Sequence, residues 1–121
     1  VFTRAGAEPA ELLTKADYEN FDLAFEFNLG GHTSTGLFIH APRNRAYRGG
    51  LEVEIIDAGG ADVHSTGALF RVVPPLNPVR TDDGAWHRCT VHMNWPVLRV
   101  TINGVVVQDI DLSAHEGTAH T

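Results

Sequence analysis

Two glutamates at alternate positions are the residues of this sequence best suited to chemistry. Glu52 and Glu54 lie in the run Leu51 to Asp57, whose other positions are mostly apolar and typical of a β-strand. Successive side chains of a strand point to opposite faces, so both carboxylates share one face, with Cα atoms about 6.6 Å apart. Carboxylates at such a spacing can act as acid and base or hold a cation together. The alternative is that they only solvate an outer surface, the more common role of glutamate.

Other polar and aromatic side chains could join this pair. Asp57 ends the same run and is expected to project from the end of the strand. His40 ends an earlier candidate strand, 36–40, and shares a face with Phe38. An aromatic ring beside an imidazole could form a platform on which a sugar stacks, although a solvent-facing or structurally satisfied histidine is more common.

Familiar catalytic and cofactor motifs are absent from the sequence. The histidines and the single cysteine show neither His-x-x-x-His nor Cys-x-x-Cys spacing, so no zinc site is indicated. The glycine pairs at 30–31 and 59–60 are isolated and indicate turns, not a phosphate-binding loop. Neither Ser34 nor Ser65 lies in a Gly-x-Ser-x-Gly elbow, so a serine hydrolase is not indicated.

Composition predicts one folded domain. A chain of 121 residues with 43% hydrophobic residues is long enough for one core, and too apolar to remain disordered. The net charge of -6 disfavours binding to nucleic acid or to an anionic membrane. No run approaches the roughly 20 apolar residues of a membrane span, so we expect a soluble chain. Cys89 has no partner for an intrachain disulfide and is expected to be a small buried hydrophobe.

Period-two alternation dominates the chain. Phe21 to Leu29 places large apolar residues at every second position, which predicts a strand with one buried face. Asn103-Gly104 separates two alternating runs between Leu98 and Leu112 and predicts a hairpin with a type I′ turn. The predicted register pairs Ile102 with Val105, Thr101 with Val106, Val100 with Val107 and Arg99 with Gln108.

Shorter strands are predicted at 36–40, 51–57, 68–72 and 86–93, and a proline-rich loop at 74–84. Residues 11–18 could form a helical turn. No amphipathic helix is available to cover a sheet, so two sheets must cover each other. The predicted fold is all-β, a two-sheet antiparallel sandwich or jelly roll.

The order of these segments resembles the 3-keto-disaccharide hydrolase family. The resemblance spans about 13–109. It is carried by Leu13-Thr14-Lys15 with Tyr18 and Phe21, by Ser34-Thr35-Gly36-Leu37-Phe38-Ile39-His40, and by Gly50-Leu51-Glu52-Val53-Glu54-Ile55-Ile56-Asp57. Later landmarks are Thr66-Gly67-Ala68-Leu69-Phe70, Trp86 and Asn103-Gly104.

The resemblance implies a concanavalin A-like (LamG-like) jelly roll, usually exported to the periplasm or beyond in bacteria. It also implies hydrolysis of glycosides whose sugar carries a ketone at carbon 3, because that ketone acidifies the neighbouring carbon 2 hydrogen for removal by a base. The implied catalytic residues are Glu52, Glu54 and Asp57; the implied substrate-binding residues are His40, Phe38, Ser34 and Glu26. No metal ligand set is implied, although Ca²⁺ or Mn²⁺ could gather the carboxylate oxygens.

The chain departs from the family pattern in its details. Ser34-Thr35-Gly36 stands where Asn-Ser-Gly is usual, His40 where arginine is usual, and Glu54 where glutamine is usual, so substrate contacts would differ. The chain ends before the closing strand of the family pattern and begins without much of its opening strand. We therefore expect a single sandwich domain over 1–121, truncated at both ends, that could complete its sheet with a second copy or a neighbouring domain.

Two other functions fit the same scaffold. A non-catalytic carbohydrate-binding or interaction module would leave the acidic group flat and wet, whereas an enzyme would hold it in a partly desolvated site. A purely structural domain of a larger protein would bind neither glycan nor keto-sugar.

Overall fold

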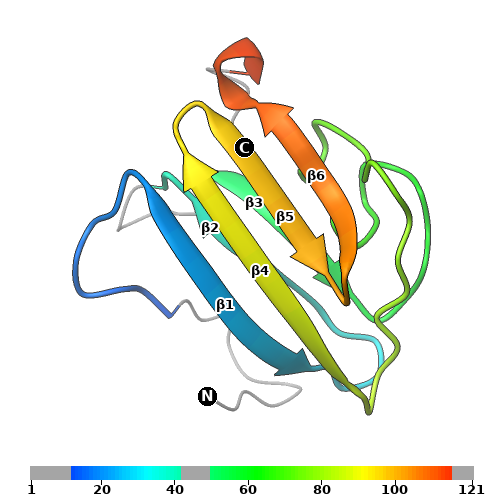
Figure 1. Cartoon of the computed structure of the whole chain (residues 1–121). Coiled ribbons are helices and arrows are strands. Elements are labelled where there is room, and N and C mark those ends of the chain that lie inside the picture. The colour runs from blue at the N-terminus through cyan, green and yellow to red at the C-terminus, as the bar shows by residue number, and fades with distance from the viewer. Residues whose placement is uncertain (1–11, 42–49, 116–121) are drawn as a thin grey trace.

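The computed structural model describes residues 12–41 and 50–115 and consists of two antiparallel sheets (Figure 1). The larger sheet has the strand order β1-β4-β5-β6, and the smaller sheet pairs β2 with β3. The strands are β1 Phe21–Asn28, β2 Ser34–Ile39, β3 Leu51–Ile56, β4 Trp86–Asn94, β5 Val97–Ile102 and β6 Val105–Asp111, followed by the short 3₁₀ helix η1 Leu112–His115. The prediction of an all-β, two-sheet sandwich is confirmed.

The core lies between the two sheets, with β2 and β3 behind β4 and β5 in the view of Figure 1. Alternate residues of β4 and β5 form its centre because period-two side chains project to one face. The buried cluster comprises Cys89, Val91, Met93, Leu98, Val100 and Ile102 from these strands, with Ile39, Val53, Leu69, Val107 and Leu112. Each large apolar side chain buried in this way contributes about 1.5–3 kcal/mol. The expectation that Cys89 is a buried hydrophobe is confirmed, since it is fully buried.

Strand β1 lies at one edge of the larger sheet, where it pairs with β4. Its alternation is as predicted, with Phe21, Phe25 and Phe27 packed against the core. Leu23 on the same face is 37% exposed, because an edge strand is covered less completely than a central one.

The predicted hairpin is present, but its register changes part-way along. Asn103 and Gly104 both have positive φ angles, 51° and 79°, as a type I′ turn requires. Beyond Ile102–Val105 and Thr101–Val106 the prediction is wrong: Val100 lies opposite Gln108, and Arg99 lies opposite Asp109.

A β-bulge causes this shift, because β6 contributes one extra residue there. The bulge lets two consecutive residues, Val107 and Gln108, both turn inward. The Gln108 amide donates hydrogen bonds of 3.0 Å to the carbonyl oxygens of Gly67 and Pro74, so its buried polar group is satisfied.

Residues 68–72 do not form the predicted strand. Leu69 makes isolated bridges to Val53 and Val73, and the chain turns back after it. The amides of Val72 and Val73 both donate to the Leu69 carbonyl, and Arg71 has a positive φ of 63°. A local turn therefore replaces the continuing ladder.

The segment 67–70 nevertheless supports β3. The amide of Glu54 donates to the Ala68 carbonyl at 3.0 Å, while Gly67 and Phe70 donate to the carbonyls of Glu54 and Glu52 at 2.8 Å. Strand β3 is thus held on both sides, by β2 and by this segment.

Two further expectations concern segments outside the strands. The described part of 11–18 contains no helix, and the 74–84 segment leaves the sheet as predicted and returns through a turn at Gly84. Across the described residues, we find no helix with the length and apolarity needed to span a membrane.

Candidate functional site

The two glutamates lie on the outer face of the smaller sheet, the face turned away from β1, β4, β5 and β6. Val53 lies between the two glutamates in β3 and Ile55 follows them, and both are buried in the core. Alternation therefore directs Glu52 and Glu54 to the face opposite the core. In the β2–β3 register Glu52 lies opposite Phe38, and Glu54 lies opposite Gly36. Strand alternation thus places Glu52 and Glu54 on one face of β3.

Glu54 is buried, with 3% of its surface exposed. Its Oε1 accepts a hydrogen bond of 2.9 Å from the Ser34 hydroxyl and one of 3.1 Å from the amide of Ile55. Burial of a carboxylate is costly unless donors replace water, and these two donors supply part of that replacement. Ser34, an expected substrate-binding residue, therefore contacts the acidic pair directly.

Glu52 has a pKa shifted toward neutral pH. Burial raises the pKa of Glu52 to about 7, and the negative charge of Glu54 adds to the rise. A carboxylate whose pKa lies close to physiological pH is both available in its basic form and strong enough to accept a proton. Glu52 is thus partly desolvated beside a like charge, which makes it a candidate base on this face.

A pair of buried threonines fixes the end of β3 beside Glu54. The Thr66 hydroxyl lies 2.9 Å from both the amide and the carbonyl of Ile56, and Thr81 donates to the same carbonyl at 2.6 Å. The two hydroxyls are 2.9 Å apart. The two threonines thus satisfy the amide and carbonyl of Ile56, which point away from β2. Thr66 belongs to a sequence landmark, but no pattern in the sequence pointed to Thr81.

Asp57 lies apart from the two glutamates. Its Oδ2 accepts a hydrogen bond of 2.5 Å from the amide of His32, and its own amide donates to the Thr33 carbonyl. It follows the end of β3, five residues from Glu52, a separation of about 16 Å along a strand. Asp57 closes the turn that precedes β2, so the structure does not bring it to the carboxylate pair.

His40 also lies elsewhere, while Phe38 stays beside Glu52. His40 has a positive φ of 51°, which turns it out of the alternation of β2. Its ring stacks on Trp95 with centroids 5.2 Å apart, and its Nε2 lies 3.0 Å from the Glu19 carbonyl. Trp95 lies in the turn between β4 and β5, and Glu19 just precedes β1, so both partners lie at one end of the larger sheet. His40 therefore does not stand opposite the glutamates as expected.

Glu26 is on the opposite side of the sandwich. It projects from the outer face of the larger sheet, opposite Arg88 in the β1–β4 register, with 3.9 Å between Oε1 and the Arg88 Nη1. Two stacked sheets lie about 10 Å apart, so Glu26 cannot reach a ligand bound at Glu52. Sequence alternation alone could not distinguish the two outer faces.

Comparison with known proteins supports the resemblance seen in the sequence. A family model described as a 3-keto-alpha-glucoside-1,2-lyase-like domain matches residues 2–120. The chain belongs to this family.

Two crystal structures of Parabacteroides distasonis proteins, both named as putative glycosyl hydrolases, share the fold of this family member. One superposes with a TM-score of 0.75 at 23% identity and covers 83% of this chain and 55% of the other. The second gives a TM-score of 0.69 at 19% identity, covering 78% and 50%. The chain thus spans about half the length of these relatives. No curated protein matches it.

The described residues show no cluster of three metal-ligating side chains. Glu52 and Glu54 provide two carboxylates, but within 12–41 and 50–115 no group of three histidine, cysteine, aspartate or glutamate residues is close enough to hold a metal ion. Cations such as Ca²⁺ take six or more oxygen ligands.

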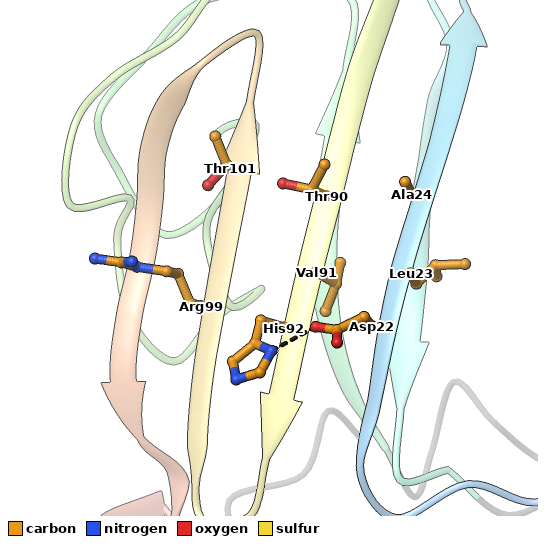
Figure 2. Close-up of a pocket in the computed structure, with 8 residues that line it drawn as sticks. All are labelled: Asp22, Leu23, Ala24, Thr90, Val91, His92, Arg99 and Thr101. Atoms are coloured by element: carbon orange, nitrogen blue, oxygen red, sulfur yellow. Dashed lines mark hydrogen bonds and ion pairs between the residues drawn. The ribbon is translucent and has the colours of Figure 1, made fainter.

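A hollow of about 320 Å³ lies on the outer face of the larger sheet (Figure 2). Ala24, Thr90 and Thr101 form a row across β1, β4 and β5, beside a row that contains Asp22, His92 and Arg99. Figure 2 shows the contact between His92 and Asp22, whose side chains are 56% and 81% exposed. Water solvates both of these groups, whereas Glu52 on the smaller sheet is partly desolvated.

Proposed function

We propose that this domain cleaves glycosides oxidised at carbon 3 of the sugar, with Glu52 as the base. The observation that carries the proposal is the raised pKa of Glu52, about 7. The Glu52 carboxylate is half-buried and lies beside the charge of Glu54. The family description names a 3-keto-alpha-glucoside-1,2-lyase, and an elimination that forms a C1–C2 double bond beside the ketone needs such a base.

The proposed reaction begins with loss of the carbon 2 hydrogen. Glu52 takes it as a proton, and the electron pair of the C2–H bond passes into an enolate whose charge rests on the carbon 3 oxygen. Collapse of the enolate forms a C1–C2 double bond and breaks the bond from C1 to the glycosidic oxygen. The departing alcohol takes a proton, for which the newly protonated Glu52 is a donor.

Water then completes the hydrolysis. It adds its oxygen at C1 and a hydrogen at C2, which yields the free 3-keto sugar and regenerates the site. Phe38, opposite Glu52 in the strand register, offers an apolar ring beside the base on which a sugar face can pack.

The experiment is the turnover of 3-keto-trehalose and 3-keto-sucrose by the wild type and by Glu52→Gln. Gln keeps the shape of the side chain but cannot accept the proton, so we expect turnover to fall about 10²- to 10⁴-fold. Wild-type turnover should rise with pH through about 7, as Glu52 loses its proton. Assays with and without a chelator would show whether a cation contributes.

The matched control is Glu26→Gln, the same substitution on the opposite outer face, in an exposed ion pair of little energetic value. It should leave turnover unchanged. Undiminished turnover in Glu52→Gln would remove Glu52 from the mechanism. Binding of the keto-sugar without turnover by the wild type would favour the alternative, a carbohydrate-binding module.

A further inference from the structure

Gly36 occupies a position in β2 where glycine is unfavourable on local grounds. It lies in the interior of the strand, where glycine costs backbone entropy and offers no side chain to pack. Its backbone is extended, without the positive φ that would require glycine. A glycine within a strand often marks the close approach of another group.

The group that approaches Gly36 is the side chain of Glu52. A Cβ atom built on Gly36 would lie 2.3 Å from Oε1 of Glu52, 2.6 Å from its Cγ and 2.8 Å from its Cδ. These three atoms are the nearest neighbours of that Cβ position. Distances below 3.0 Å are not found for real Cβ atoms, so any other residue at 36 would force the Glu52 side chain to move.

The space over Gly36 determines where the carboxylate lies. Glu52 pairs with Phe38, and Gly36 is the diagonal neighbour that pairs with Glu54. By lying flat over Gly36, Glu52 brings its carboxylate alongside Glu54 and out of bulk water. The half burial and the nearby like charge of Glu52 both follow from this position.

We propose that Gly36 is a positioning residue, whose missing side chain lets the Glu52 carboxylate lie against β2 beside Glu54. The expected effect of Gly36 on catalysis rests on the proposed function. Its effect on the position of the Glu52 side chain rests only on the contact between the two residues.

The first test is the Gly36→Ala variant, compared with Gly30→Ala. The Cβ of Gly30→Ala would meet its nearest atom, the Thr33 hydroxyl, at 3.4 Å, which is ordinary contact. We expect Gly36→Ala to lower turnover of 3-keto-trehalose at least 100-fold and Gly30→Ala to leave it within about twofold. By NMR titration, the Glu52 midpoint should fall from about 7 toward 4.5 in Gly36→Ala alone. An unchanged midpoint would overturn the proposal.

The second test separates positioning from a general loss of folding. In the wild-type background, Gly36→Ala should lower the melting temperature by roughly 5 °C. In a Glu52→Ala background the clashing atoms are gone, and the same substitution should leave the melting temperature unchanged or raise it. An equal loss in both backgrounds would contradict the proposal. Full turnover in Glu52→Gln would contradict the proposed function. The melting temperatures in the two backgrounds and the NMR titration would still test whether Gly36 positions the Glu52 side chain.

Discussion

The hydroxyl of Ser34 donates a 2.9 Å hydrogen bond to Oε1 of Glu54, across two strands and twenty residues of sequence. The two residues are diagonal neighbours, since Ser34 pairs with Ile56 and Glu54 pairs with Gly36. This bond places a donor on a buried carboxylate, and that carboxylate in turn lies beside Glu52. Ser34 therefore influences the candidate base through Glu54.

Ser34→Ala should destabilise the domain by about 2 kcal/mol, because a hydrogen bond to a buried charged group is lost. Urea unfolding followed by tryptophan fluorescence would measure the change. Ser34→Thr retains the hydroxyl in a residue suited to a strand, and should recover most of the loss. If the alanine and threonine variants unfold at the same urea concentration, the hydroxyl contributes nothing to stability.

The stability of the domain should fall as pH rises from about 5 to 7. Burial and Glu54 raise the pKa of Glu52 from 4.5 to about 7, so the folded state binds the proton more tightly than the unfolded state. The resulting stabilisation is complete below about pH 4.5 and is lost as pH rises through 7. After discounting for solvent screening at this half-buried position, we expect a change of about 1 kcal/mol.

Glu52→Gln should remove this slope, as measured by urea unfolding at several pH values. Asp62 and Asp111 do not mask it. Their pKa values are lowered below 3.8 by hydrogen bonds, chiefly from His64 and Ser113 respectively, so their opposite effect appears below about pH 4. A Glu52→Gln protein with the same slope between pH 5 and 7 would assign the titration to another group.

Thr66 should be more sensitive to substitution than Thr81. Thr66→Val removes the acceptor of the Ile56 amide as well as a hydroxyl contact to the Ile56 carbonyl, so we expect a loss of about 2 kcal/mol. Thr81→Val removes a donor to a carbonyl that Thr66 also contacts, for about 1 kcal/mol. Thermal unfolding of the two variants would rank them, and the reverse order would show that Thr81 is the main anchor.

Cys89 should be unreactive in the folded domain. It is fully buried, and burial raises the pKa of its thiol to about 11, so almost no thiolate exists at neutral pH. A thiol reagent such as a disulfide dye should label it only as the domain unfolds, with a rate that increases with urea. Labelling within minutes in native buffer would show that β4 opens readily.

Most of the strands could be predicted from the sequence because each needs only local information. The alternation of β1, the turn residues Asn103-Gly104 and the apolar positions of β3 determine strand, turn and buried face without reference to distant residues. The shared face of Glu52 and Glu54 follows from the same rule. The prediction failed at 68–72, where an apolar run turns back on itself, since a turn and a strand there have similar local composition.

The all-β class, the family and the placement of two acids on one face of one strand therefore follow from the sequence. Which residues join the two acids depends on how the strands and sheets pack. The tertiary structure sends Glu26 to the far side of the sandwich, turns His40 onto Trp95 and leaves Asp57 in a turn, and it brings Ser34 and Gly36 to the acids. Alternation assigns a side chain to a face within its own strand. Contacts between strands depend in addition on register, on how the two sheets stack and, for His40, on its positive φ angle.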